Sequence, residues 1–266
     1  MVRILVTDGI AKSAVEKLEA AGFEVVMEFC EPEVLEQKVR EFDALIVRSA
    51  TKVRKPALDA AAEAGRLKLI IRGGVGLDNI DVAYAKEKGI EVKNTPNASS
   101  ISVAEMAIGH IFSVARNLAF ANVTMRQGAW EKKACAGVEL FGKTLGLIGL
   151  GRIGAETAKR AKALGMDVIY TTRSGPKAGA GEYRFVSLDE LLARSDFISL
   201  HLPAAKDADP LINRETIAKM KDGVCIINTA RGGLVDDCAL AAAVRDGRLR
   251  GAGLDGVERE PLSPDD

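Results

Sequence analysis

Short apolar runs alternate along the whole chain with longer segments of helical periodicity. The first series of strand-like runs is RILVT, FEVVMEF, DALIVRS, LKLIIRG and IEVKN, and the second is TLGLIGL, MDVIYTT, DFISLHL, GVCIINT and GAGLD. Segments between them, such as AKSAVEKLEAAG and PALDAAAEAG, carry apolar residues at helical spacing and end in glycine. Strands that alternate with helices form parallel sheets. The pattern therefore predicts an α/β fold of two doubly wound domains, residues 1–97 and 98–266, with a cleft between them.

One long helix-like segment, residues 99–127, separates the two series. Its apolar residues, among them Val103, Met106 and Phe112, lie on more than one side of the helix. One side is expected in the core that ties the domains together, and another is expected to cover a second copy of the chain, with Trp130 as an anchor. The segment therefore predicts a homodimer through the long helix 99–127.

A glycine-rich turn follows the first strand of the second series. Gly149, Gly151 and Gly154 are spaced G-x-G-x-x-G between TLGLIGL and the helical segment AETAKRAKAL. The first glycine permits a tight turn, the second lets the backbone approach a pyrophosphate, and the third lets helix and strand pack closely. Glycine-rich turns also occur in other α/β proteins. With strand, helix and the next strand all in place, however, the pattern predicts a dinucleotide site at a helix N-terminus.

Composition excludes several kinds of partner. Lys plus Arg and Asp plus Glu number 37 each, so no basic field exists to recruit nucleic acid or an anionic membrane. No apolar run approaches the length of a membrane span, and MVRILVTD meets an acidic residue too soon for a signal peptide. The four cysteines form no C-x-x-C pair and the two histidines are not spaced as metal ligands, so we expect no metal and a reduced, cytoplasmic location.

Three arginines stand directly after predicted strands, where α/β sheets bind ligands. Arg48 follows DALIV, Arg72 follows LKLII, and Arg231 follows GVCIINT after one alanine. Any one of them could be only a solvated surface charge, but three at equivalent places point to a site. Guanidinium groups bind carboxylate and phosphate bidentately, and Gly73 and Gly74 add exposed N–H groups. The sequence therefore predicts a small substrate with more than one anionic group.

Several motifs together carry a family resemblance. GLGRIG, the RGGLVDD segment, GAGLD and EREPL, in this order and at these separations, resemble the D-2-hydroxyacid dehydrogenases. IVRSATKV, GLDNID and NTPNASSISVAE make the chain most similar to short-type D-3-phosphoglycerate dehydrogenases. The resemblance covers essentially the whole chain. It implies a dimeric enzyme in which a 2-hydroxy acid and a 2-keto acid exchange a hydride with a nicotinamide cofactor.

The resemblance also implies roles for individual residues. Arg231 would hold the substrate carboxylate and carbonyl. Arg48 and Arg72 would face a distal phosphate, within a substrate-binding group completed by Ser49, Gly73 and Gly74. Besides the three glycines of the turn, the resemblance assigns to the cofactor Arg152 and Ile153 at the pyrophosphate, Leu202 and Pro203 at the end of DFISLHLP, and Thr229, Ala230 and Asp255 at the nicotinamide end.

The catalytic acid is the part of the family pattern that the sequence lacks. In the family a histidine protonates the forming alkoxide and a glutamate supports its pKa; Glu260 matches the glutamate, whereas the expected Pro-His motif would come after PLSPDD. His201 and His110 are alternatives, but the first resembles an additional family histidine and the second lies inside the long helix. We therefore expect the 266-residue chain to bind cofactor and to turn over little or not at all.

The residue that selects between the two nicotinamide cofactors is neutral here. The family pattern places it at Thr172, where an Asp or Glu would repel a 2′-phosphate. Arg173, Ser174 and Lys177 follow with groups able to bind that phosphate. In the alternative interpretation this loop is simply solvated and NAD binds through its other contacts. The sequence predicts a preference for NADP over NAD.

Three functions stay open on these observations. The leading hypothesis is a dehydrogenase of 3-phosphoglycerate, with 3-phosphohydroxypyruvate as its keto acid. A glyoxylate or hydroxypyruvate reductase would share the fold and Arg231 but would need no pocket for a distal phosphate. A nucleotide-sensing interaction module without catalysis is the third, and it would be consistent with the missing histidine.

Overall fold

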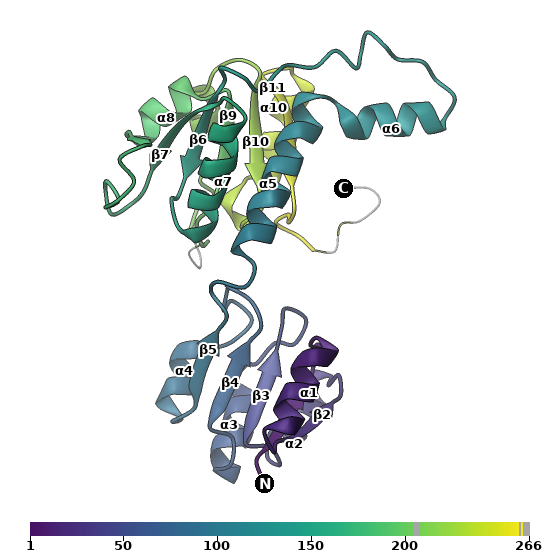
Figure 1. Ribbon diagram of the computed structural model, residues 1–266, viewed down its shortest axis with the longest axis vertical. Helices are drawn as coiled ribbons and strands as arrows, with labels where there is room; N and C mark the ends of the chain where they lie inside the picture. Colours follow the sequence, from purple (N-terminus) through teal and green to yellow (C-terminus); the bar gives the residue numbers. More distant parts are fainter. Residues whose placement is uncertain (205–207, 261, 263–266) are drawn as a thin grey trace. The chain divides into compact units, whose positions relative to one another are not determined.

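The computed structural model describes residues 1–204, 208–260 and 262. The chain divides into two compact units, Met1–Ser99 and Ser100–Asp266, here called unit 1 and unit 2. Figure 1 shows the elements of both units, and each unit is described by itself.

Unit 1 is a parallel five-stranded sheet in the order β2-β1-β3-β4-β5. All five strands predicted for this region are present. Neighbouring strands contribute Leu5, Leu45 and Ile70, which are paired in register across β1, β3 and β4 and are fully buried. The elements are β1 (Arg3–Val6), α1 (Lys12–Ala20), β2 (Glu24–Met27), α2 (Pro32–Lys38), β3 (Ala44–Val47), α3 (Lys55–Ala64), β4 (Leu69–Arg72), α4 (Val82–Glu87) and β5 (Glu91–Asn94).

Unit 2 contains a parallel six-stranded sheet in the order β11-β10-β9-β6-β7-β8. The five predicted strands are present, and β8 is an additional strand of two residues. The elements from the sheet onward are β6 (Thr144–Ile148), α7 (Arg152–Ala163), β7 (Asp167–Thr171), β8 (Arg184–Phe185), α8 (Leu188–Arg194), β9 (Phe197–Leu200), α9 (Arg214–Ala218), β10 (Val224–Asn228), a 3-10 turn η1 (Gly232–Leu234), α10 (Asp237–Arg245) and β11 (Leu249–Leu254).

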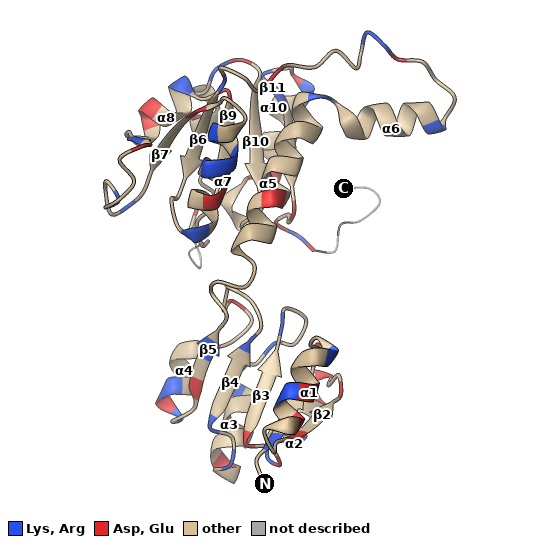
Figure 2. Ribbon diagram, viewed as in Figure 1, with Lys and Arg blue, Asp and Glu red and all other residues tan. Residues whose placement is uncertain are grey.

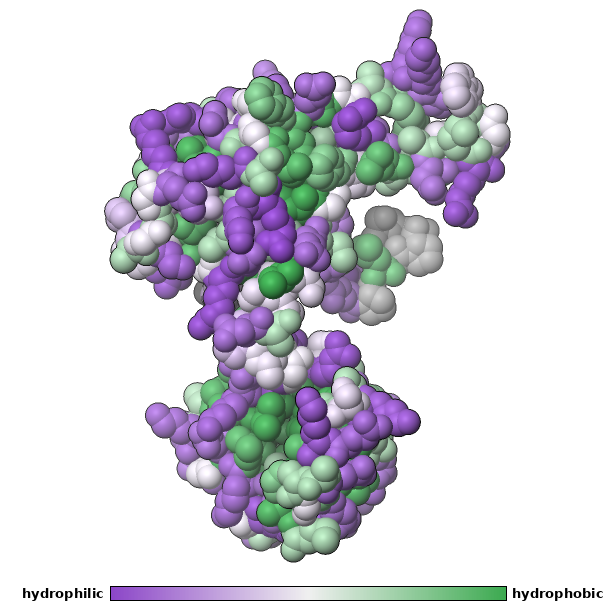
Figure 3. Space-filling view, in the orientation of Figure 1, coloured by the Kyte–Doolittle hydropathy of each residue, from purple (hydrophilic) through white to green (hydrophobic). Residues whose placement is uncertain are grey.

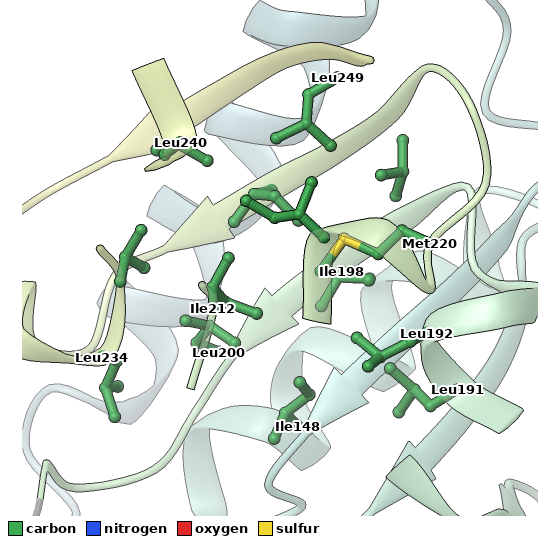
Figure 4. Close-up of a cluster of buried hydrophobic side chains, with 14 of the residues drawn as sticks. Ile148, Leu191, Leu192, Ile198, Leu200, Ile212, Met220, Leu234, Leu240 and Leu249 are labelled. Atoms are coloured by element: carbon green, nitrogen blue, oxygen red, sulfur yellow. The ribbon is translucent and has the colours of Figure 1, made fainter. Parts of the chain in front are cut away.

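Apolar side chains fill both faces of this sheet. On one face, side chains from the strands pack against α8, α9 and α10, as Figure 4 shows for Ile148, Ile198 and Leu240. On the other face, Leu145, Leu147 and Ile227 pack with residues of α5 (Ser100–Ala115) and α7. Both faces are covered, which is why the central strands read as continuous apolar runs rather than as alternating ones.

The predicted single helix over residues 99–127 is wrong, because the chain breaks it into α5 (Ser100–Ala115) and α6 (Leu118–Arg126). Asn117 lies between them in the left-handed region, with φ 54°. Asparagine tolerates this conformation better than most residues do. Its side chain also donates to the carbonyl oxygens of Ala134 and Ala136, at 3.3 Å and 3.2 Å, which fixes the bend.

The two helices differ in burial. On α5, Ala104, Ala107, Ile111 and Ala115 form a buried stripe against the sheet, whereas α6 has no buried residue. Residues 117–136, here called the arm, project from the sheet of unit 2 (Figure 1). Packing against the rest of unit 2 therefore accounts for the apolar residues of α5 but not for those of α6.

The distribution of charge and hydropathy is ordinary for a globular chain. Figure 2 shows basic and acidic residues interspersed over the helices of both units. Within the described residues, no helix combines the length and the apolar character needed to cross a bilayer.

Candidate active site

The glycine turn after β6 has the geometry that a pyrophosphate site requires. Gly149 has φ 101°, and a Cβ on it would collide with the His201 carbonyl oxygen. A Cβ on Gly154 would collide with the Gly149 carbonyl, whereas a Cβ on Gly151 would meet no atom within 4 Å. Gly149 and Gly154 are thus needed for close packing, and Gly151 leaves open space on the ligand side.

This turn lies at the point where the strand order of unit 2 reverses. β6 has β7 on one side and β9 on the other. The chain therefore adds strands first on the β7 side of β6 and then on its β9 side. Ligands of open α/β sheets bind at such a point. Arg152 and Ile153 begin α7, and no side chain of the described residues caps this helix, so the N–H groups of its first turn are left for an anion.

The loop after β7 forms a tight turn beside the glycines. The Gly175 N–H donates to the Thr172 carbonyl at 3.2 Å, and the Thr172 hydroxyl donates to the Gly175 carbonyl at 2.5 Å. Arg173 and Ser174 are the exposed central residues of that turn. Lys177 reaches back, and its Nζ donates to the Leu150 carbonyl at 2.5 Å. A positive charge therefore lies at the glycine turn itself.

His201 follows β9 and supports the same turn. Its N–H donates to the Ile148 carbonyl at 2.8 Å, and its ring Nε2 lies 2.9 Å from the Ser199 hydroxyl. Burial lowers the pKa of His201 to about 4, so the imidazole is neutral at neutral pH. A neutral imidazole is a poor proton donor, which favours a structural role over the acid role. Leu202 and Pro203 continue the chain along this edge.

Asn228, the last residue of β10, organises the loop that the family resemblance assigns to the nicotinamide end. It is buried; its Oδ1 accepts from Ala230 N–H at 3.0 Å and its Nδ2 donates to the Arg231 carbonyl at 2.8 Å. Its own carbonyl accepts from Asp255 N–H at 2.9 Å. This one residue thereby brings Ala230, Arg231 and Asp255 together, the first two through its side chain and Asp255 through its backbone carbonyl. We missed Asn228 in the sequence, although a polar residue closing an otherwise apolar strand is a detectable signal.

Thr229 and Glu260 complete the candidate residues of unit 2. The Thr229 hydroxyl is buried and has no hydrogen-bond partner among the described residues. Glu260 Oε1 accepts from the Val257 N–H at 3.3 Å, so its carboxylate turns back onto its own segment. Gly232 allows that segment to pass, because a Cβ there would collide with the Val257 carbonyl.

The candidate residues of unit 1 gather at the carboxyl ends of β3 and β4. Val47 pairs with Arg72 in register, and Gly73 N–H donates to the Val47 carbonyl at 2.8 Å. The Arg72 guanidinium lies against Gly74, where a Cβ would collide with it. Arg48 and Ser49 are exposed, and within the described residues the Arg48 side chain makes no hydrogen bond or ion pair. Two guanidinium groups at the ends of adjacent strands suit an anionic ligand.

The described residues contain no cluster of metal-ligating side chains. Among residues 1–204, 208–260 and 262, no three His, Cys, Asp or Glu side chains are grouped to hold an ion, and Cys30, Cys135, Cys225 and Cys238 are free thiols. Burial raises the pKa of Cys225 to about 12, so this thiol stays protonated. The described geometry, with its glycine turn and adjacent carboxyl-edge loops, defines a dinucleotide-binding α/β protein.

Comparison with known proteins identifies its family. Residues 108–266 match the model of the D-isomer specific 2-hydroxyacid dehydrogenase, NAD binding domain. Hydroxypyruvate reductase of Thermotoga maritima is 50% identical over 260 residues, which cover 97% of this chain and 84% of that protein. D-3-phosphoglycerate dehydrogenase of Methanocaldococcus jannaschii is 47% identical over 265 residues, 98% of this chain and 50% of that one. The structure of the acyclic imino acid reductase Bsp5 with NADPH and D-Arg has a TM-score of 0.88 at 32% identity, covering 99% of this chain and 84% of that chain.

This chain belongs to the D-isomer specific 2-hydroxyacid dehydrogenase family, a family of NAD-dependent oxidoreductases. The family and the fold class predicted from the sequence are both confirmed. The chain spans about half the length of the phosphoglycerate dehydrogenase and most of the length of the hydroxypyruvate reductase.

The residues present fit a nicotinamide dinucleotide. Gly151 faces open space, the first turn of α7 is uncapped, and Thr229 presents a buried hydroxyl with no partner among the described residues. When bound, this cofactor would accept or donate a hydride. The chain's own residues would bind its pyrophosphate at the glycine turn and its nicotinamide end at Thr229, Ala230 and Asp255.

Proposed function

We propose that this protein interconverts 3-phosphoglycerate and 3-phosphohydroxypyruvate with a nicotinamide cofactor. The observation that carries the proposal is the pair Arg48 and Arg72 on adjacent strand ends of unit 1, since a substrate with a distal phosphate needs such a pair. The 47% identity to a D-3-phosphoglycerate dehydrogenase supports it.

In this proposal each charged residue has a separate task. Arg231 binds the substrate carboxylate and polarises the reacting carbonyl. Arg48 and Arg72, with Ser49, Gly73 and Gly74, bind the distal phosphate. Glu260 supports the proton donor. Asn228 keeps Arg231 in place through its two hydrogen bonds to the loop.

Hydroxypyruvate reduction is the second candidate, favoured by the 50% identity to a hydroxypyruvate reductase. Hydroxypyruvate is 3-phosphohydroxypyruvate without the phosphate, so the two keto acids differ by the group that Arg48 would bind. Because the 266-residue chain is expected to turn over little or not at all, kinetics are measured on the full-length protein, here called the intact protein. Comparing the two substrates in one preparation of it separates the candidates.

Arg48→Ala tests the distal-phosphate assignment. Loss of a charge-assisted contact should raise the KM for 3-phosphohydroxypyruvate by about tenfold or more and leave the KM for hydroxypyruvate nearly unchanged. Lys52→Ala, four residues along and also exposed, is the matched control. Steady-state kinetics measure both constants. If Arg48→Ala affected the two substrates alike, the phosphate assignment would be wrong.

We further propose a preference for NADP over NAD. Thr172 carries no charge to repel a 2′-phosphate, Arg173 and Ser174 are exposed beside it, and Lys177 lies on the glycine turn at Leu150. The similar Bsp5 structure holds NADPH, which supports the same preference.

We also propose that the protein is a homodimer through α5 and the arm. Apolar side chains on these elements are exposed, among them Phe120 at 46%, Met125 at 56% and Trp130 at 78%. Figure 3 shows apolar residues gathered over α5 and continuing onto the arm. A second copy is the occupant we favour, because α6 has no buried residue of its own and a copy would bring an identical apolar helix.

A further inference from the structure

A polar cluster lies beneath the Arg48 loop in unit 1, and the proposed function does not use it. Asp8 follows β1, and its carboxylate accepts hydrogen bonds from Arg48 N–H at 2.6 Å, from Thr51 N–H at 3.1 Å and from the Thr51 hydroxyl at 2.5 Å. Thr51 is buried. Both ends of the segment 48–51 are thus held by one carboxylate.

Two further side chains close the cluster. The Asn79 amide donates to the carbonyl oxygens of Arg48 and Thr51, at 2.8 Å and 2.7 Å. The Thr7 hydroxyl lies 2.7 Å from the Thr51 hydroxyl, close enough to donate to it. The N–H and C=O groups at the two ends of the segment 48–51 therefore all have side-chain partners. Thr7, Thr51 and Asn79 are all buried, so the cluster lies under the loop and leaves its outer surface to solvent.

The cluster occupies the point where the strand order of unit 1 reverses. β1 lies between β2 and β3, so the chain leaves β1 in one direction and continues on its other side. Ligands bind at such points in open α/β sheets. Here the Asp8 side chain after β1 hydrogen-bonds to the backbone of the neighbouring loop, while the Arg48 side chain after β3 is exposed.

We propose that Asp8 is a positioning residue, which holds residues 48–51 in the conformation that presents Arg48 to the distal anion of the substrate. The identity of that anion rests on the proposed function. A carboxylate makes strong hydrogen bonds to N–H and O–H donors. A loop ordered in advance binds its ligand without the cost of ordering it. The three donors also offset a negative charge that would otherwise repel an anionic substrate.

The same sheet offers a matched control at its opposite edge. Asp43 directly precedes β3, and its carboxylate accepts from the backbone N–H of Arg3 at 2.7 Å and from the Arg66 side chain at 3.1 Å and 3.2 Å. Asp8 and Asp43 thus join β1 to β3 in the same way, but at the carboxyl and amino edges respectively. Both carboxylates bridge segments of β1 and β3, and only Asp8 lies under the Arg48 loop.

The kinetic test compares Asp8→Asn with Asp43→Asn in the intact protein. Asparagine keeps the size of the side chain but turns one acceptor oxygen into a donor facing an N–H. Asp8→Asn should raise the KM for 3-phosphohydroxypyruvate about tenfold, with little change in kcat or in the KM for hydroxypyruvate. Asp43→Asn should leave the ratio of the two KM values unchanged. Thr51→Val should act as Asp8→Asn does, and Thr51→Ser, which keeps the hydroxyl, should restore the wild-type KM.

Amide hydrogen exchange tests the positioning without substrate. In Asp8→Asn the amides of Arg48 and Thr51 should exchange faster, whereas in Asp43→Asn the Arg3 amide should do so instead. Unchanged exchange at Arg48 and Thr51, or an equal rise of both KM values, would overturn the role of Asp8. A wild-type protein that does not distinguish the two keto acids would overturn the proposed substrate alone, since the exchange measurement still decides what Asp8 does.

Discussion

Thr172 and its neighbours set the charge at the place proposed for the adenosine end of the cofactor. The Thr172 hydroxyl closes a turn with the Gly175 carbonyl, which leaves Arg173 exposed next to it. Lys177 adds an ammonium group fixed to the Leu150 carbonyl. Among the described residues of this turn there are two cations and no carboxylate, which would favour a ligand with an extra phosphate, because guanidinium and ammonium groups bind phosphate strongly.

Thr172→Asp should reverse the cofactor preference. A carboxylate there repels the 2′-phosphate and accepts hydrogen bonds from the unmodified ribose, so we expect NADPH to bind about tenfold or more weakly and NADH more tightly. Thr172→Val also removes the hydroxyl but adds no charge. It therefore separates the effect of the added charge from the effect of losing the hydrogen bond that closes the turn. Calorimetric titration with each cofactor measures both affinities. Tighter binding of NADH than of NADPH by the wild-type protein would contradict the proposed preference.

The strands are the elements that the sequence predicted best. Parallel strands covered on both faces are continuous apolar runs, and all ten predicted runs, from RILVT to GAGLD, are strands in the structure. β8 was missed because two residues carry no periodicity. The break at Asn117 was missed because apolar residues continue on both sides of it, while the contacts that fix it come from Ala134 and Ala136, well removed in sequence.

The residues of the candidate site could be predicted only in part, because contacts between loops depend on the order of the strands in the sheet. The rule that ligands bind beyond strand ends led to Arg48, Arg72 and Arg231, whose charged side chains stand at or after the ends of strands. Asp8 and Asn228 obey the same rule, yet their side chains act on backbone groups, Asn228 on those of its own loop and Asp8 on those of the loop after β3. Which loops are neighbours follows from the strand order, and the hydropathy pattern along the chain does not contain that order.

The arm is the element whose partner can be tested most directly. Val123 on α6 and Val34 on α2 are both exposed helix valines, at 53% and 41%. Val123→Glu places a charge in the proposed dimer contact and should weaken the dimer about tenfold or more, because burying an unpaired carboxylate is costly. Val34→Glu should leave the dimer intact. Sedimentation at several protein concentrations measures the association. A monomeric wild-type protein at tens of micromolar would refute the contact.

At the scale of the whole molecule, the hydrophobic cores divide as the units do. Within the described residues, two core clusters draw their members from residues 4–92 and two from residues 107–254, and none of the four mixes the two units. Every residue assigned to the cofactor lies in unit 2. Each unit therefore has the buried apolar surface that an independent domain needs.

Residues 100–266 produced alone should fold and bind the cofactor. Their two clusters and the whole glycine turn are retained, so we expect an affinity for NADPH within about tenfold of that of the intact protein. Residues 1–99 produced alone should fold without binding cofactor. Circular dichroism reports the folding of each fragment and calorimetry the binding. An unfolded or non-binding fragment 100–266 would show that the cofactor site depends on unit 1.

The separation of the cores has a consequence for descent. A recombination event near residue 99 would transfer either half of the gene without disturbing the packing inside the other. The half proposed to bind the distal phosphate of the substrate could then be exchanged or could diverge while the half that carries the glycine turn was inherited unchanged. New substrates would in this way arise by shuffling one half-gene, with no need to rebuild the hydride chemistry each time.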